Sequence, residues 1–258
     1  MPLPSPMHTV IDGLLAAWLR EPGSPRLTWY SSAGERVELS GKVLDNWVAK
    51  TANLLTDEFD AEPGAVVRID APAHWKTLCL ALAAWRTGAQ LHLVDPEHPG
   101  ASEPADAVLA SDAATVLAGS LSPALALTLP ALAFRWEGEL PTAPAGVIDY
   151  AAEVRQHGDQ YWRLTDPSGQ DTALVLGGRR YNYDHLAEWA RDTAAPRAAS
   201  TEDDRAQRWG LDADAGLAAV LQASLGAWLA GGSVVLCEHG ELLTDRLRDS
   251  ERITRQGA

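Results

Sequence analysis

The chain has 258 residues, of which 46% are hydrophobic, enough to bury the core of one large domain or two lobes. Its 21 Lys and Arg against 35 Asp and Glu give a formal net charge of −14, which excludes nucleic acid as an expected partner because polyanions would be repelled. Two cysteines in apolar runs, no basic leader and no apolar run of about 20 residues predict a cytoplasmic protein without disulfides, signal peptide or membrane span.

Hydrophobic spacing and turn residues predict alternating helices and strands along most of the chain. In chain order we first expect a helix over 10–19, strands over 26–30 and 36–39, a helix over 41–59, a strand over 66–69, a helix over 73–87 and a strand over 91–94. The middle of the chain is expected to form a helix over 107–111, a strand over 114–118, a helix over 146–156 and strands over 161–164 and 172–176. The last part is expected to form helices over 183–193 and 213–230, a strand over 233–237 and a helix over 241–254.

The order strand, helix, strand over 66–94 predicts a right-handed parallel crossover. The fold class is therefore α/β, with layered mixed sheets flanked by helices. We expect one region over 1–258, with two lobes at about 1–160 and 161–258. The segment 194–204, rich in Ala, Pro, Ser, Thr and acidic residues, is expected to be a mobile loop.

Four residues with metal-binding side chains surround the end of the expected strand 91–94. They are His92, Asp95, Glu97 and His98. Open α/β sheets usually bind ligands at the carboxyl ends of their strands, and imidazole and carboxylate are common metal ligands. The spacing matches no standard metal motif, so an imidazole at the edge of the core beside an ordinary Asp-Pro turn is the alternative.

A candidate anion site lies between two expected elements. It consists of Gly177, Gly178, Arg179 and Arg180. Backbone amides and guanidinium groups at a strand-to-helix turn can hold a phosphate or carboxylate, although the Lys-Ser/Thr ending of a P-loop is missing. A hairpin or a turn with solvated arginines is the alternative. No serine stands in a G-x-S-x-G context, so a hydrolase triad is not expected.

Eight of the ten tryptophans fall into two groups. Five occupy apolar faces or ends of expected helices, where a large ring buries much surface, and are expected core anchors; they are Trp18, Trp47, Trp85, Trp189 and Trp228. Three others are candidates for contact with a ligand or partner; they are Trp136, Trp162 and Trp209.

Several blocks of the chain resemble the N-terminal region of the AMP-forming acyl-CoA synthetases, the adenylate-forming superfamily. The blocks are 37–55, Pro-Gly-Ala-Val-Val-Arg-Ile at 63–69, Ala-Ala-Trp-Arg-Thr-Gly-Ala at 83–89, Leu-His-Leu-Val-Asp-Pro at 91–96 and Leu-Ala-Gly-Gly-Ser-Val-Val-Leu at 229–236. The resemblance implies the fold of that family's N-terminal subdomains.

The family's catalytic motifs are not matched. Its Ser/Thr/Gly-rich loop, which ends in Pro-Lys-Gly and holds the ATP phosphates, corresponds to 165–173, where Thr165, Ser168 and Gly169 are the remaining candidate ligand contacts. This stretch has one glycine, no lysine and two aspartates, Asp166 and Asp171, which oppose triphosphate binding. The magnesium motif Tyr-Gly-x-Thr-Glu, the ribose-binding aspartate and the C-terminal lid with its lysine have no counterpart before Ala258.

The resemblance thus implies a truncated, degenerate relative with no catalytic residue of its own. We expect a non-catalytic binding or regulatory protein of unknown small-molecule ligand, with residual AMP or ATP binding as the candidate cofactor. One alternative is an interaction protein without a small ligand, most simply a homodimer that buries exposed apolar surface. The other is a divergent adenylate-forming enzyme that a partner chain completes.

Overall fold

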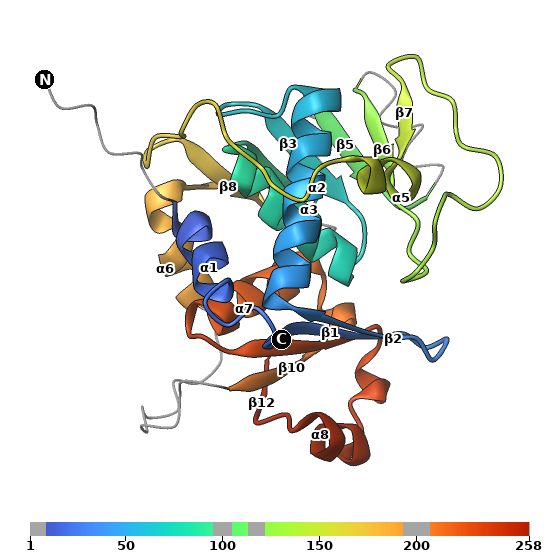
Figure 1. Cartoon of the computed structure of the whole chain (residues 1–258), viewed down its shortest axis with the longest axis vertical. Helices are drawn as coiled ribbons and strands as arrows, with labels where there is room; N and C mark the ends of the chain where they lie inside the picture. The colour runs from blue at the N-terminus through green and yellow to red at the C-terminus, as the bar shows by residue number, and fades with distance from the viewer. Residues whose placement is uncertain (1–8, 95–104, 113–121, 193–206, 258) are drawn as a thin grey trace, which may run out of the picture. The chain divides into compact units, whose positions relative to one another are not determined.

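The computed structural model describes four stretches of the chain, namely residues 9–94, 105–112, 122–192 and 207–257. Within them the chain forms a mixed α/β fold with two sheets, one of seven and one of five strands (Figure 1). This confirms the predicted fold class. The described helices include none that is both long and apolar enough to cross a membrane.

One compact unit comprises Met1–Gly13, Asn46–Ala71 and Cys79–Leu186 and holds the seven-stranded sheet, in the order β7-β6-β5-β3-β4-β8-β9. Its strands are β3 (Val66–Asp70), β4 (Gln90–Leu93), β5 (Ala107–Ala110), β6 (Ala124–Ala126), β7 (Val147–Asp149), β8 (Thr172–Leu176) and β9 (Arg179–Asn182). Every neighbouring pair is parallel except β8 and β9, which form an antiparallel hairpin at one edge. We call this the first unit.

The second unit comprises Leu14–Asp45, Pro72–Leu78 and Ala187–Ala258 and holds the five-stranded sheet, in the order β12-β10-β11-β1-β2. Its strands are β1 (Pro25–Tyr30), β2 (Arg36–Ser40), β10 (Arg208–Asp212), β11 (Ser233–Cys237) and β12 (Arg255–Gln256). Only β1 and β2 pair antiparallel. In the core of this unit Trp18 and Trp228 meet edge to face, with ring centroids 5.4 Å apart.

The α-helices in the described stretches are α1 (Val10–Trp18), α2 (Gly41–Phe59), α3 (Trp75–Thr87), α5 (Tyr150–Glu153), α6 (Leu186–Arg191), α7 (Leu217–Leu229) and α8 (Asp245–Glu251). Short 3₁₀ turns are η1 (Val154–Gln156), η2 (Tyr183–His185), η4 (Ala213–Ala215) and η5 (Gly240–Leu242). A capping box begins α1, because the Thr9 amide donates to the Asp12 carboxylate and the Asp12 amide donates to the Thr9 hydroxyl.

The helix predicted over 107–111 is wrong, since Ala107–Ala110 is the buried strand β5, paired in parallel with β3. A strand buried on both faces has no alternation of apolar and polar residues, and alanine favours helix, so its sequence does not distinguish the two. The helix predicted over 146–156 begins late, because Val147–Asp149 is β7 and the Asp149 carboxylate caps α5. The predicted strand 114–118 lies outside the described residues.

The strand predicted over 161–164 is also wrong. Aromatic residues favour a strand here, but neither side chain packs against a sheet: the Tyr161 hydroxyl bonds the Thr56 hydroxyl of α2 at 3.2 Å, and Trp162 is 79% exposed. The final helix is shorter than the predicted 241–254, since Gly240–Leu242 is the 3₁₀ turn η5 and α8 spans only Asp245–Glu251. Of the helices predicted over 183–193 and 213–230, the first residues form the 3₁₀ turns η2 and η4, and the α-helices are Leu186–Arg191 and Leu217–Leu229. The remaining predicted helices and strands within the described stretches are confirmed to within two residues at each end.

The tryptophans predicted to anchor the core are buried, except Trp47, which is partly exposed; the buried ones are Trp18, Trp85, Trp189 and Trp228. Of the three predicted to contact a ligand or partner, Trp209 is buried in β10 beneath the Arg255 guanidinium, 4.3 Å from its ring. Trp136 is partly exposed, and only Trp162 stands clear in solvent.

Candidate functional site

The loop 165–173 in the first unit hydrogen-bonds to itself. The Ser168 amide donates to the Asp171 carboxylate at 2.7 Å, and the Asp171 amide donates back to the Ser168 carbonyl at 3.0 Å. The Gln170 amide donates to the Ser168 hydroxyl at 3.2 Å. A phosphate-binding loop needs free amide N–H groups that point at the ligand. Here the amides of Ser168, Gln170 and Asp171 already have partners. The Asp171 carboxylate lies at the Ser168 amide, where a bound anion would otherwise lie.

A second carboxylate covers the glycine of this loop. The Asp184 amide donates to the Gly169 carbonyl at 3.0 Å, and a Cβ added to Gly169 would lie 2.2 Å from Asp184 Oδ1. The Gln170 side chain also donates to Asp184 at 3.0 Å. A side chain at position 169 would therefore displace the Asp184 carboxylate. Thr165 lies exposed at the start of the loop.

The arginine nearest the loop in sequence is already neutralised. Arg163 pairs with the carboxylates of Asp12 at 3.0 Å and Asp166 at 2.8 Å and donates to the Arg86 carbonyl at 2.9 Å. Although burial of the guanidinium opposes its charge, these carboxylates raise the Arg163 pKa. These two ion pairs neutralise the positive charge of Arg163, so the guanidinium does not attract a phosphate.

The predicted anion site at 177–180 is a hairpin turn. Gly177 and Gly178 have φ values of 53° and 76° and connect β8 to β9, as in a type I′ turn. Arg179 and Arg180 lie exposed on the edge strand β9. Successive side chains of a strand point to opposite faces, so the two guanidinium groups do not converge on one ligand. The arrangement corresponds to the hairpin alternative.

Of the four predicted metal ligands, only His92 lies in a described stretch. It sits in β4, buried, with its neighbours Leu91 and Leu93 also buried. Asp95, Glu97 and His98 lie outside the described residues, so the metal hypothesis for this group stays a prediction.

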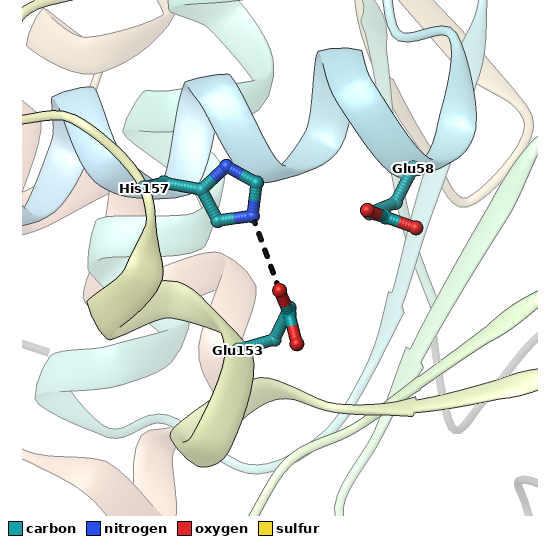
Figure 2. Close-up of side chains that lie close together, drawn as sticks. All are labelled: Glu58, Glu153 and His157. Carbon is teal, nitrogen blue, oxygen red and sulfur yellow. Dashed lines mark ion pairs between the residues drawn. The ribbon is translucent and has the colours of Figure 1, made fainter.

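The structure brings together a different set of potential metal ligands, which sequence reasoning missed: Glu58, Glu153 and His157 (Figure 2). One ligand atom from each lies within 4.8 Å of the others. The only sequence signal is the spacing of Glu153 and His157, four residues apart, with His157 directly after the helix predicted over 146–156; one more helical residue would have placed both on one face. Glu58 comes from the end of α2, almost a hundred residues earlier, and no local pattern connects it to them.

The loop that carries His157 is fastened to one face of α2. Lys50 donates to the His157 carbonyl, and the Asn53 side chain donates to the carbonyls of Gly158 and Gln160, both at 2.9 Å. Asp57, one turn further along, pairs with His157 Nδ1 at 3.2 Å. Spacings of three and four residues place these anchors along one stripe of the helix, so the position of His157 is fixed from its backbone and its ring.

The fold is that of the adenylate-forming enzymes, as comparison with solved structures shows. The chain superposes on an acyl-CoA synthetase from Brucella canis with a TM-score of 0.70 and 19% identity, over 96% of this chain and 47% of that one. It superposes on the N-terminal domain of FACL13 from Mycobacterium tuberculosis with a TM-score of 0.68 and 14% identity, over 98% of this chain and 63% of that one. It superposes on coronafacic acid ligase from Pectobacterium brasiliense with a TM-score of 0.69 and 12% identity, over 95% of this chain and 49% of that one.

The chain thus spans about half to two thirds of the length of the structures it matches. No family model matches its sequence. A TIGR03089 family protein of Mycobacterium tuberculosis is 38% identical over 191 residues, which cover 74% of this chain and 72% of that protein. The chain therefore belongs to the TIGR03089 family.

Proposed function

We propose that the chain is a non-catalytic binding or regulatory protein built on the scaffold of the adenylate-forming enzymes. Its loop 165–173 does not bind the phosphates of ATP, and the protein binds its ligand without contacts to a triphosphate. The likeness to acyl-CoA synthetases concerns the fold alone. The proposed function rests on the residues of this chain, because one fold hosts many functions.

The self-bonded loop 165–173 is the observation that carries this proposal. Binding a triphosphate there would require breaking the bond between the Ser168 amide and the Asp171 carboxylate. It would also bring polyanionic oxygens against Asp171 and Asp184, with Arg163 already paired. At about 4 Å, two like charges repel by roughly 4 kcal/mol at an effective dielectric constant of 20, and no free cation of the loop offsets that cost.

The test of the proposal is pyrophosphate release from Mg·ATP in the presence of a panel of carboxylic acids. We expect no release above the rate without protein. A release that requires both the protein and one particular acid would contradict the proposal and favour the divergent enzyme instead. Thermal shift with AMP, coenzyme A and acyl-adenylate analogues then searches for the ligand, since any molecule that binds only the folded chain raises its melting temperature.

A second candidate, an interaction protein that forms a homodimer, is favoured by two exposed apolar side chains. Trp162 and Leu164 are 79% and 99% exposed in the first unit, and neighbouring exposed apolar groups commonly mark interaction surfaces. Light scattering should then give twice the monomer mass for the wild type and the monomer mass for Trp162→Ser/Leu164→Ser. A monomer for both proteins at high concentration rules this candidate out.

A further inference from the structure

We propose that Glu58, Glu153 and His157 form a binding site for a divalent transition-metal ion, best represented by Zn²⁺. This site goes beyond the proposed function and does not depend on it. It is also separate from the group around His92, because it is built by the end of α2 and by the short helical segment that follows β7.

The donor atoms are arranged around a common point. His157 Nε2 and Glu153 Oε1 are 3.9 Å apart and point toward each other, while Glu58 approaches from α2 (Figure 2). A separation of 3.9 Å is too long for a hydrogen bond. Two ligands bound to one tetrahedral ion at about 2.1 Å lie about 3.4 Å apart. A small inward rotation of the two glutamates therefore completes the coordination.

His157 Nε2 has an unmet requirement that a metal ion would satisfy. The side chain is only 11% exposed, and Nε2 is buried without a hydrogen-bond partner. A buried polar atom left without a partner destabilises the folded chain. Since Nε2 faces the two glutamates, an ion bound there provides the missing partner.

Asp57 fixes which nitrogen of His157 is available. Its carboxylate lies 3.2 Å from Nδ1, and a carboxylate at this position favours the tautomer with the proton on Nδ1. The lone pair is then on Nε2, the atom that faces the cluster. A carboxylate behind a metal-bound histidine is a common arrangement, which orients the ring and raises its basicity. Asp57 is thus a positioning residue.

Glu153 is oriented in a similar way. Gln156 donates to its Oε2 at 3.0 Å, which leaves Oε1 turned toward His157. One imidazole with two carboxylates suits Zn²⁺, Co²⁺ or Mn²⁺ better than Mg²⁺ or Ca²⁺, which prefer oxygen ligands alone. Three protein ligands leave a fourth position to water, and the exposure of Glu58 gives solvent access to it.

The test is equilibrium dialysis and calorimetry of the full chain, first freed of metal by chelation, against Zn²⁺ and Co²⁺. We expect one saturable Zn²⁺ site per chain and a visible Co²⁺ spectrum. Asp57→Asn should weaken Zn²⁺ binding by about 10- to 100-fold, and His157→Ala should weaken it further. Because Glu58 is exposed, Glu58→Gln should leave the fold intact. We expect this variant, too, to bind Zn²⁺ more weakly than the wild type, which would report the loss of a metal ligand.

The matched control is His185→Ala, which removes an exposed histidine of the same unit and should bind Zn²⁺ like the wild type. His98→Ala removes a histidine of the other candidate group and reports whether that group holds the metal. The proposal is overturned if no saturable site exists, or if His157→Ala and Glu58→Gln bind as tightly as the wild type. Loss of binding in His98→Ala alone would assign the metal to the group around His92 instead.

Discussion

His74 is a buried histidine whose surroundings keep it neutral. It is 2% exposed and packs edge-on against Trp29, with ring centroids 4.3 Å apart. Its Nδ1 accepts from the Lys76 amide at 3.1 Å, and its Nε2 has no hydrogen-bond partner. Burial, and secondarily the charge of Lys76, lower the His74 pKa from 6.5 to about 3.

This pKa shift predicts an acid-sensitive fold. Between pH 6.5 and about 3 the unfolded chain binds a proton at His74 that the folded chain does not, so the free energy of unfolding falls as the pH falls through that window. From pH 7 to pH 5 the loss from this group is about 2 kcal/mol. Urea unfolding of His74→Asn, which keeps an acceptor near Nδ1, should show a smaller loss.

The matched control for this experiment is His185→Asn, which alters an exposed histidine. It should retain the full loss of stability seen in the wild type between the two pH values. Identical pH dependence in the wild type and His74→Asn would show that His74 takes up its proton in the folded state, contrary to the burial argument.

Both cysteines are predicted to be chemically inert in the folded chain. Cys79 and Cys237 have no exposed surface, and burial raises each thiol pKa to about 12. The thiolate is the reactive form, so neither should react with Ellman's reagent at pH 8 until the chain is unfolded, when both should react. Rapid labelling of one thiol in the folded protein would contradict the burial of that residue.

Two helical glycines allow a prediction at the scale of secondary-structure elements. A Cβ at Gly226 in α7 would lie 2.7 Å from the Ala190 carbonyl oxygen of α6, whereas a Cβ at Gly13 in α1 would meet nothing within 4 Å. Gly13→Ala should therefore stabilise the fold by about 0.5–1 kcal/mol, the usual gain within a helix. Gly226→Ala should destabilise it by about 1–3 kcal/mol, the usual cost of overpacking.

Chemical denaturation of the two glycine variants beside the wild type measures both effects, with each serving as the control for the other. Stabilisation by both substitutions would mean that α6 shifts to accommodate the methyl group of Gly226→Ala with almost no loss in the free energy of unfolding. Destabilisation by both would mean that the α1 position is more confined than its open surroundings indicate.

The elements that could be predicted from sequence combine a clear period with turn residues at both ends. Helix α2 has an apolar stripe that starts after Ser40, and β11 follows Gly231 and Gly232 directly. Strand β5 has neither feature, because Ala-Val-Leu-Ala fits a buried helix as well as a buried strand. Pairing with β3 decides its conformation, and such pairing is not encoded in four residues.

The candidate site shows the same limit. The lack of a lysine and the aspartates of loop 165–173 could be read directly, and the structure adds that Asp171 bonds the Ser168 amide. The contribution of Asp184 could not be predicted, because it lies outside the loop and approaches Gly169 only through the fold. The metal cluster needed the fold for the same reason, since Glu58 is remote in sequence from His157.

The scaffold matches adenylate-forming enzymes over nearly the entire chain. In the first unit, however, the carboxylates of Asp12 and Asp166 pair with Arg163, and those of Asp171 and Asp184 accept hydrogen bonds from Ser168 and Gln170 of loop 165–173. We therefore expect the family's fold to be retained while the triphosphate is not bound.

Calorimetric titration of the wild type and of Asp171→Asn/Asp184→Asn with Mg·ATP at neutral pH tests this claim most directly. We expect no saturable heat for the wild type, and weak but measurable binding once the two carboxylates no longer occupy the loop and repel phosphate. Saturable binding of ATP to the wild type, as tight as to the double variant, would show that these aspartates do not keep ATP out of the loop.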